Sequence, residues 1–246
     1  QALANTAWAF ATAGHSSPVL FDALASASVQ RVDEFKPQDL ANTAWAYAVN
    51  NNFALNAALI RSLAPSLDDA SAKEALSEEH YHQLHQFILW HREYGAPSPL
   101  SASVTQQASA AFRASPASPS GLQRSVGTVL SDLGLEPREE VESEESGYSA
   151  DFVVTCPASG EDVAVEVDGP YHFMRGGSRR EPTGATLLKR RQVTALGWPR
   201  LVSVPYWEWD ELGGGEGGDG ERRRERQRAY LLSAVQATAA TEESST

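Results

Sequence analysis

The stretch VEVDGPYHF, Val165 to Phe173, carries side chains that could act on a phosphodiester bond. A strand period of two places Glu166 and Asp168 on the face opposite the valines. Asp151 opens an earlier strand-like run, DFVV, and would reach Glu166 if the two strands pair antiparallel. Three converging carboxylates would form a hard-oxygen site for Mg²⁺ or Mn²⁺, which could activate water and offset charge on the phosphate.

Two further side chains complete this catalytic hypothesis. Lys189, in the basic run LLKRR, could stabilise charge on a scissile phosphate, and His172 could move a proton. Asp168 also has a purely structural interpretation, because it precedes Gly169 and Pro170 and can cap a turn. If the site is catalytic, its residues are Asp151, Glu166, Asp168, His172 and Lys189, with the three acids as metal ligands.

The second half of the chain must position these residues, and its periodicity predicts the order α-β-β-β-α-β-α. We expect the aromatic run Tyr206, Trp207, Trp209 to continue the last strand. These rings could stack bases, but alternation predicts that at least one of them lies in the core. Before a Gly-rich loop at residues 213–220, the expected strands are Glu136–Glu142, Ala150–Cys156, Asp162–Asp168 and Arg200–Pro205. The expected helices are Gly121–Leu133, Thr183–Leu196 and, after that loop, Glu221–Val235.

The first half contains an internal repeat. Residues 1–11, QALANTAWAFA, return as residues 38–48, QDLANTAWAYA, with nine of eleven positions identical at a period of 37. Each copy spaces its apolar residues as one helix face, as at Leu3, Ala7 and Phe10, and a second helix follows, at Pro18–Val29 and Phe53–Leu63. Helical hairpins of this kind bury their apolar faces only against neighbours, so we expect a solenoid.

Polar and aromatic residues of these helices have competing interpretations. We expect Trp8 and Trp45 to pack between helices, whereas Asn5 and Asn42 are candidates for reading bases. A third helix, about Glu78 to Tyr94, holds four of the 6 histidines. No cysteine accompanies them, so a solvated helix face is favoured over a metal site.

Charge is unevenly distributed along this acidic chain of net charge −12. Twelve of the 20 Lys and Arg residues fall between Phe173 and Arg228, whereas Asp132 to Asp151 holds eight acids and one arginine. A local basic face of this kind is typical of a nucleic-acid site, although a solvated surface gives the same count. The single cysteine, Cys156, excludes an intramolecular disulfide framework, and no run is long enough to span a membrane.

The combination of motifs resembles a known family. EVDGPYHF, then TLLKRRQV, LGW and VSVPYWEW, is similar to the RAP domain, a module named for RNA binding, over roughly Leu122 to Leu232. The element order resembles the PD-(D/E)xK nuclease superfamily, whose metal-binding acids would correspond to Asp151 and Glu166. Asp168 stands where that superfamily has a lysine, which replaces a phosphate-stabilising cation by an anion. The repeats resemble octotricopeptide RNA-binding repeats.

This resemblance implies an α plus α/β protein: helical solenoid repeats followed by a restriction-endonuclease-like αβββαβ domain. We expect a helical repeat region at residues 1–100, a Pro/Ser-rich segment at 101–119, the RAP-like domain at 120–235 and a disordered tail at 236–246. The missing initiator Met indicates a fragment of a longer chain. The implied location is an organelle, the mitochondrion first and the chloroplast as the alternative.

Single-stranded RNA is held by basic side chains along its backbone and by aromatic faces under its bases. Arg222 to Arg228 form a second basic run, which could contact phosphate or be a solvated helix face. The predicted RNA-binding residues combine aromatic and basic types: Tyr171, Phe173, Arg175, Arg179, Arg180, Lys189, Arg190, Arg191 and Trp207.

The leading hypothesis is therefore a non-catalytic RNA-binding protein of an organelle, acting in RNA processing, stability, translation or the mitochondrial ribosome. Its partners would be single-stranded or ribosomal RNA and components of ribosomal or other ribonucleoprotein particles, and binding would require no cofactor. The rival is a Mg²⁺- or Mn²⁺-dependent endoribonuclease. A third idea is a protein-binding scaffold without RNA.

Overall fold

The computed structural model describes residues 1–53, 56–114, 119–176, 180–213 and 220–237. The chain divides into two compact units. The helical unit comprises Gln1–Ser115 and Phe173–Gln192, and the sheet unit comprises Pro116–His172 and Val193–Thr246. The helical unit is therefore discontinuous in sequence, because a segment from the second half of the chain completes it.

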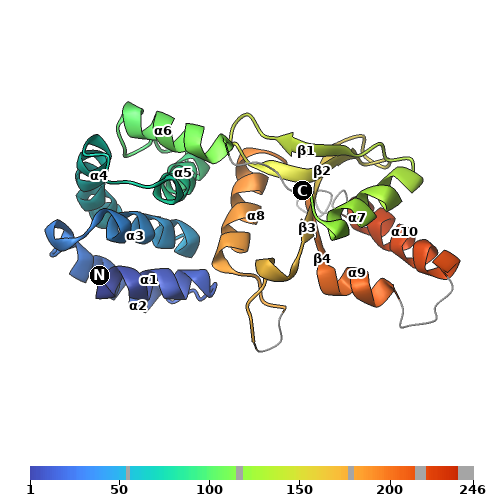
Figure 1. Cartoon of the computed structure of the whole chain (residues 1–246), viewed down its shortest axis with the longest axis horizontal. Coiled ribbons are helices and arrows are strands. Elements are labelled where there is room, and N and C mark those ends of the chain that lie inside the picture. The colour runs from blue at the N-terminus through green and yellow to red at the C-terminus, as the bar shows by residue number, and fades with distance from the viewer. Residues whose placement is uncertain (54–55, 115–118, 177–179, 214–219, 238–246) are drawn as a thin grey trace, which may run out of the picture. The chain divides into compact units, whose positions relative to one another are not determined.

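The helical unit is built from paired helices (Figure 1). Helix α3 lies between α1 and α5, α2 packs on α4, and α6 packs on α5. The helix bounds are α1 Ala2–Thr12, α2 Pro18–Val29, α3 Pro37–Asn50, α4 Ala57–Ala72, α5 Glu78–Glu93 and α6 Ala102–Arg113, with a short 3-10 helix, η1, at Val32–Glu34. Pro18 and Pro37 occupy the first turns of their helices, where a missing N–H is tolerated.

The two copies of the repeat are covered to different extents. Trp45 is buried, and its Nε1 donates to Gln86 Oε1 over 2.8 Å, whereas Trp8 is 41% exposed. Phe10 is also exposed, at 37%, so its predicted place on the buried face is wrong. The difference follows from position, because α3 lies between α1 and α5, whereas α1 packs mainly against α3 and α2.

Two predictions about polar residues in these helices are wrong. Asn42 is buried and accepts a hydrogen bond from Gln83 Nε2, so it is not available to read a base. Helix α5 is not a solvated histidine face, because His85 and His91 are buried. His85 lies against Phe112, and His91 lies among Phe53, Phe87 and Trp90. The error arose because helix packing covers a face that composition alone suggests is polar.

One helix differs from the sequence prediction in extent, and another was not predicted. Helix α4 begins later and ends later than Phe53–Leu63, because Leu63, Leu67 and Ala70 continue its buried face beyond Pro65. Helix α6 lies within the segment expected to be Pro/Ser-rich, where Ser101 Oγ caps it by accepting from Val104 N. The predicted tail falls largely at residues 238–246, outside the described residues.

The sheet unit contains a mixed four-stranded sheet of order β1-β2-β3-β4. Strands β1, β2 and β3 are antiparallel neighbours, and β4 joins β3 in parallel after the crossover through α8. The strand bounds are β1 Arg138–Glu142, β2 Ser149–Thr155, β3 Asp162–Asp168 and β4 Leu201–Pro205. The observed order of elements confirms the predicted α-β-β-β-α-β series and the α plus α/β class.

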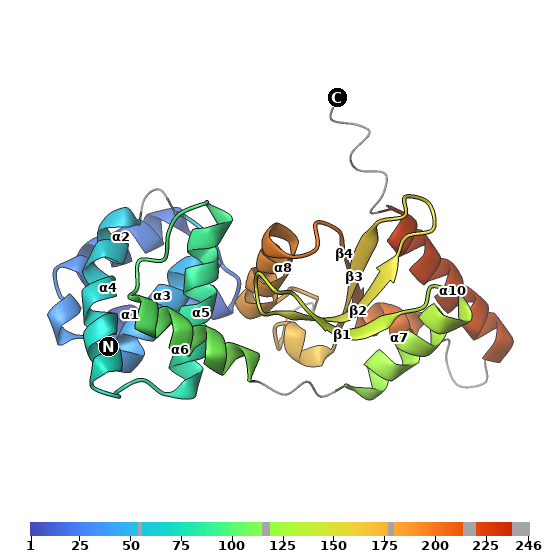
Figure 2. The same cartoon turned by 90° about the horizontal axis from the view of Figure 1, so that it is seen from above.

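Helices α7 (Gly121–Asp132) and α10 (Gly220–Ala237) cover one face of this sheet (Figure 2). Their buried residues, Val126, Leu130 and Leu231 among them, share a core with the strand valines. Cys156 is buried in this core. The opposite sheet face carries Val153 and Ala164, followed toward the end of β3 by the acidic residues.

The predicted continuation of β4 into its aromatic run is wrong. Tyr206–Leu212 forms helix α9, because Pro205 is extended and ends the strand as the N-cap of the helix. Trp209 is buried under it and donates from Nε1 to Ser125 Oγ over 3.1 Å, whereas Tyr206 and Trp207 are half-buried. The expectation that at least one aromatic belongs to the core is confirmed. No helix among the described residues is long and apolar enough to cross a membrane.

Candidate functional site

The acidic residues lie together at the end of β3, as the alternation predicts. Phe152 pairs with Val165, so in the antiparallel register Asp151 lies opposite Glu166. The Asp151 carboxylate does not project away from the sheet, because its Oδ2 accepts a hydrogen bond from Val167 N over 2.6 Å. Asp151 thus closes the end of the β2–β3 ladder.

Asp168 connects three segments of the sheet unit. Its Oδ2 accepts from Ser203 Oγ over 2.5 Å, and its Oδ1 lies 3.0 Å from His172 Nδ1. Ser203 belongs to β4, and His172 ends the short 3-10 helix η2, Pro170–His172. The carboxylate therefore ties β3 both to its parallel neighbour and to the turn that follows it, which agrees with the structural interpretation of Asp168.

Sequence reasoning missed Ser203, although a signal for it exists. In LVSVP it is the one polar residue of an apolar strand, and the parallel register places it opposite Glu166. A serine on the same face as two acids is a natural hydrogen-bond donor to them. Glu166 and Asp168 are 3% and 2% exposed, so this polar group is buried.

Two of the three predicted metal ligands are hydrogen-bonded within the sheet unit. Both Asp168 oxygens face hydrogen-bonding groups of the protein, and one Asp151 oxygen is taken by a backbone amide. Throughout the part of the chain that the structure describes, no three His, Cys, Asp or Glu side chains are grouped so that they could hold a metal. This arrangement gives no support for chemistry at a bound Mg²⁺ or Mn²⁺.

The predicted catalytic lysine belongs to the other unit. Lys189 is a half-buried residue of α8 (Gly184–Leu196), and the helical unit includes this helix as far as Gln192. The sequence alone could not reveal this division, because α8 is the element directly before β4 in the chain.

The predicted RNA-binding residues near η2 divide by exposure. Tyr171 is 80% exposed and Phe173 is 4% exposed, so Phe173 is not a base-stacking surface. Phe173 bridges to Pro182, and Met174 N donates to Glu181 O over 2.8 Å. These contacts close the base of a loop on which Arg175 and Arg180 are exposed. Arg179 lies outside the described residues.

Arg191 does not face outward, contrary to the prediction for the run Lys189 to Arg191. Its guanidinium donates from Nε to Glu93 Oε2 over 2.6 Å and from Nη2 to Ala48 O over 2.6 Å, both within the helical unit. Lys189 and Arg190 are half-buried. The sequence could not predict this role, because the partners lie about a hundred residues or more earlier in the chain.

The arginines of helix α10 divide into two groups. Arg226 and Arg228 donate to the carbonyls of Leu212 and Asp132, which end α9 and α7, so both stabilise helix ends. Arg222 and Arg224 are exposed and line a groove of about 710 Å³ together with Arg228 and three acids. This groove therefore has mixed charge.

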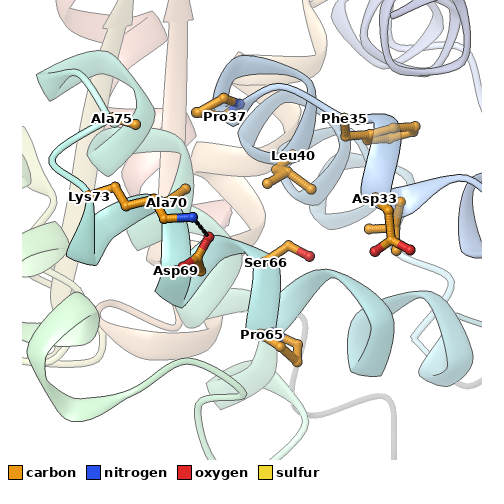
Figure 3. A pocket seen from close by; sticks show the side chains of 11 residues that line it. Asp33, Phe35, Pro37, Leu40, Pro65, Ser66, Asp69, Ala70, Lys73 and Ala75 are labelled. Atoms are coloured by element: carbon orange, nitrogen blue, oxygen red, sulfur yellow. Dashed lines mark hydrogen bonds and ion pairs between the residues drawn. The ribbon is translucent and has the colours of Figure 1, made fainter.

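The helical unit has its own groove, of about 460 Å³, between η1, the start of α3 and α4 (Figure 3). Phe35, Leu40 and Pro65 line it, and Lys73 Nζ and Asp69 Oδ2 form an ion pair across 2.7 Å at its edge. Asp33 adds a further acid, so this groove does not resemble a nucleic-acid site.

Comparison with known proteins identifies the second half of the chain. Residues 165–231 match the RAP domain, from β3 through most of α10. The chain contains a RAP domain. A rice (Oryza sativa subsp. japonica) protein described as "RAP domain-containing protein, chloroplastic" is 39% identical over 95 residues, which are 39% of this chain and 13% of the rice protein. The similarity thus spans a small part of that relative's length.

The RAP match includes residues of both units. Phe173–Gln192 lie inside the matched range and belong to the helical unit. The acidic strand, Ser203 and Tyr171 lie inside it as well and belong to the sheet unit. The RAP domain therefore contains both the buried polar group and the exposed aromatic and basic residues.

Proposed function

We propose that this is an organellar RNA-binding protein whose RAP domain holds single-stranded RNA without cleaving it. The observation that carries the proposal is the contrast around η2. Glu166 and Asp168 of β3 are buried, and Asp168 is hydrogen-bonded to Ser203 within the sheet, whereas Tyr171, Arg175 and Arg180 are exposed. Exposed aromatic rings stack bases and arginines contact phosphates, which together suffice to bind a single strand.

The proposed location is the chloroplast, ahead of the mitochondrion predicted from the sequence, because the rice relative is described as chloroplastic. The proposed targets are single-stranded stretches of organellar transcripts or ribosomal RNA, and the proposed partners are ribosomal or other ribonucleoprotein components. The helical repeats would contribute to RNA contact through exposed residues such as Asn5, since Asn42 is buried.

Binding of fluorescently labelled single-stranded RNA, followed by anisotropy, tests the proposal. Loss of one stacking residue costs about 1–3 kcal/mol per base, so Tyr171→Ala should weaken binding roughly tenfold. Tyr171→Phe keeps the aromatic face and should bind nearly as well as the original chain. Equal binding by Tyr171→Ala would remove the aromatic ring from the RNA site.

A cleavage assay separates binding from nuclease activity. The same RNA, incubated with Mg²⁺ or with EDTA and analysed on a gel, should be shifted and remain intact in both. Cleavage that requires Mg²⁺ and disappears in Glu166→Gln would replace the proposal with a metal-dependent endoribonuclease. If the RNA is neither shifted nor cleaved at any protein concentration, both RNA binding and RNA cleavage are refuted.

A further inference from the structure

One helix of the RAP domain is packed into the core of the helical repeats. Leu188 of α8 is fully buried and shares a hydrophobic core with Leu40 and Trp90. Gly184, at the start of α8, approaches Ala11 so closely that an added Cβ would lie 1.8 Å from the Ala11 carbonyl oxygen. The first turns of α8 are therefore fitted to the ends of the repeat helices.

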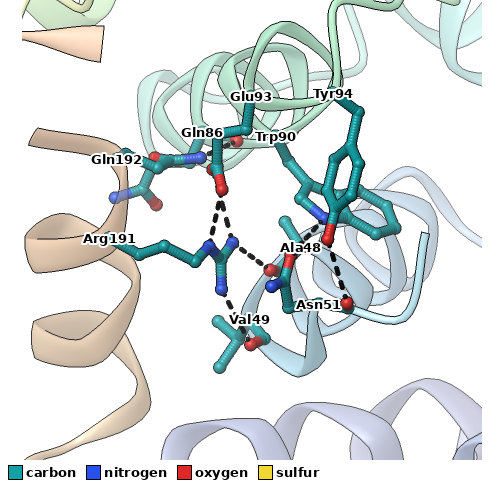
Figure 4. A network of polar contacts seen from close by, with 9 residues as sticks. All are labelled: Ala48, Val49, Asn51, Gln86, Trp90, Glu93, Tyr94, Arg191 and Gln192. Atoms are coloured by element: carbon teal, nitrogen blue, oxygen red, sulfur yellow. Dashed lines mark hydrogen bonds and ion pairs between the residues drawn. The ribbon is translucent and has the colours of Figure 1, made fainter. Parts of the chain in front are cut away.

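Arg191 occupies a socket formed by the ends of two repeat helices (Figure 4). Nη1 donates to Val49 O over 3.3 Å and Nη2 to Ala48 O over 2.6 Å, where α3 ends. Nε donates to Glu93 Oε2 over 2.6 Å, at the end of α5. The last carbonyls of a helix have no partner within it and carry its negative end, so this socket suits a cation.

The socket is fixed by contacts within the repeats. Asn51 adopts a left-handed conformation (φ 62°) just after α3, and its Oδ1 accepts from Trp90 Nε1 over 2.9 Å and from Tyr94 OH over 3.1 Å. These bonds hold the end of α3 against α5 (Figure 4). The Glu93 side chain is 6% exposed, so its carboxylate requires the cation that Arg191 supplies.

A second side chain of α8 enters the same surface. Gln192 is fully buried and donates from Nε2 to the backbone oxygen of Gln86 over 2.7 Å. Arginine fits the site for a reason beyond charge, because its planar fork satisfies a carboxylate and two carbonyls at once, whereas lysine presents a point charge. Arg191 and Gln192, two consecutive residues of α8, thus form hydrogen bonds with α3 and α5 of the repeats.

We propose that the ends of α3 and α5 are a docking surface for the RAP-domain helix α8, and that Arg191 is a positioning residue for RNA binding rather than an RNA ligand. The role of Arg191 in RNA binding rests on the proposed function. Lys189 and Arg190 precede Arg191 on the same helix, so docking of Arg191 sets how α8 carries them. The affinity for RNA then depends on the bonds between Arg191 and the ends of α3 and α5, although RNA does not touch Arg191.

Two measurements on the full chain test this proposal. Hydrogen exchange of the α8 amides reports docking without RNA, and anisotropy reports RNA affinity. Arg191→Met keeps much of the side-chain volume and leaves Glu93 without its cation, so α8 amides should exchange about tenfold faster. RNA affinity should fall about tenfold if docking positions the basic residues. Arg191→Lys should retain only part of the α8 protection and part of the RNA affinity, because a lysine cannot bond to the carboxylate and both carbonyls at once.

A control separates docking from general loss of stability. Gly127→Ala destabilises the sheet unit, because its Cβ would lie 2.8 Å from the Phe152 ring, and it leaves the socket untouched. Unchanged α8 exchange in Arg191→Met would overturn the docking role, and an equal loss of RNA affinity in Gly127→Ala would overturn the positioning role. Absence of RNA binding by the original chain would instead refute the proposed function, while the exchange result still decides the docking.

Discussion

At the level of single residues, burial decides which polar side chains serve the fold. Asp168 was a candidate metal ligand and Arg191 a candidate phosphate ligand, and both have structural partners: Ser203 and His172 for the first, Glu93 and two carbonyls for the second. Tyr171, one position from His172, is 80% exposed. Residue type alone does not separate these cases, because each type suits both uses.

Gly184 marks a close approach that no other residue type permits. Gly184→Ala places a Cβ 1.8 Å from Ala11 O and 3.0 Å from Val49 Cγ1, so backbone must move. We expect a loss of roughly 3 kcal/mol in unfolding free energy, the upper range of overpacking costs, measured by urea denaturation. Gly169→Ala has no atom within 4 Å of the new Cβ and should change stability little. An equal loss of unfolding free energy in Gly184→Ala and Gly169→Ala would contradict the close packing of Gly184 against Ala11.

His91 gives the helical unit a pH-dependent stability. Burial lowers the pKa of His91 to about 4, despite a hydrogen bond to the backbone of Pro97 that opposes the shift. The unfolded chain binds a proton near the ordinary pKa of 6.5, so it holds more protons than the folded state between these values. Stability is therefore fully present above pH 6.5 and is lost as pH falls toward 4.

The size of this loss can be measured by urea denaturation at pH 7 and pH 4.5. We expect His91 to account for on the order of 2 kcal/mol of the difference in unfolding free energy. His91→Phe retains a ring beside Phe53 and Phe87 and should reduce the pH dependence by that amount. A pH dependence that stays the same in His91→Phe would assign the effect to other groups.

At the level of elements, the sequence predicts regular segments better than their interactions. Helix Pro18–Val29 and strand Asp162–Asp168 have the predicted bounds, because proline, glycine and strict alternation mark them locally. The aromatic run Tyr206–Trp209 was predicted to continue the strand, but it lies in helix α9, since aromatic alternation over four residues fits either structure once the helix packs. The partners of Arg191 depend on tertiary structure and have no local signal.

Helix α9 depends on one tryptophan. Trp209 is 1% exposed and bonded to Ser125, whereas Trp207 of the same helix is half-buried. Trp209→Ala should lower the unfolding free energy by roughly 3–5 kcal/mol, as large-to-small core substitutions do. Trp207→Ala should cost less than half as much. Thermal unfolding followed by circular dichroism measures both, and the reverse order would contradict the assignment of Trp209 to the core.

At the level of the whole molecule, a net charge of −12 requires that RNA be held locally. The sequence predicts the concentration of basic residues between Phe173 and Arg228. The exposure of Arg175 and the burial of Phe173 could be seen only in the structure. Local contact has a measurable signature, because each phosphate contact on a single strand contributes a fixed share of the salt dependence.

Arg175→Gln should reduce the slope of log affinity against log salt concentration by about 0.7, the value for one phosphate contact on a single strand. Anisotropy titrations between low and high salt give this slope. Arg61→Gln, an exposed arginine of α4, should lower neither the affinity nor the slope. If both variants change the slope equally, RNA is attracted by the overall field rather than held at the loop.

The discontinuity of the helical unit has a consequence for how the protein is made. A ribosome adds residues in order, and domains generally fold as they emerge. The repeat helices are complete by Arg113, but Leu188, Arg191 and Gln192 follow only after three strands have been synthesised. Until then the carboxylate of Glu93 and the last carbonyls of α3 lack the cation that pairs with them in the finished protein. The nascent chain thus carries a solvated, incomplete repeat surface that closes late in translation.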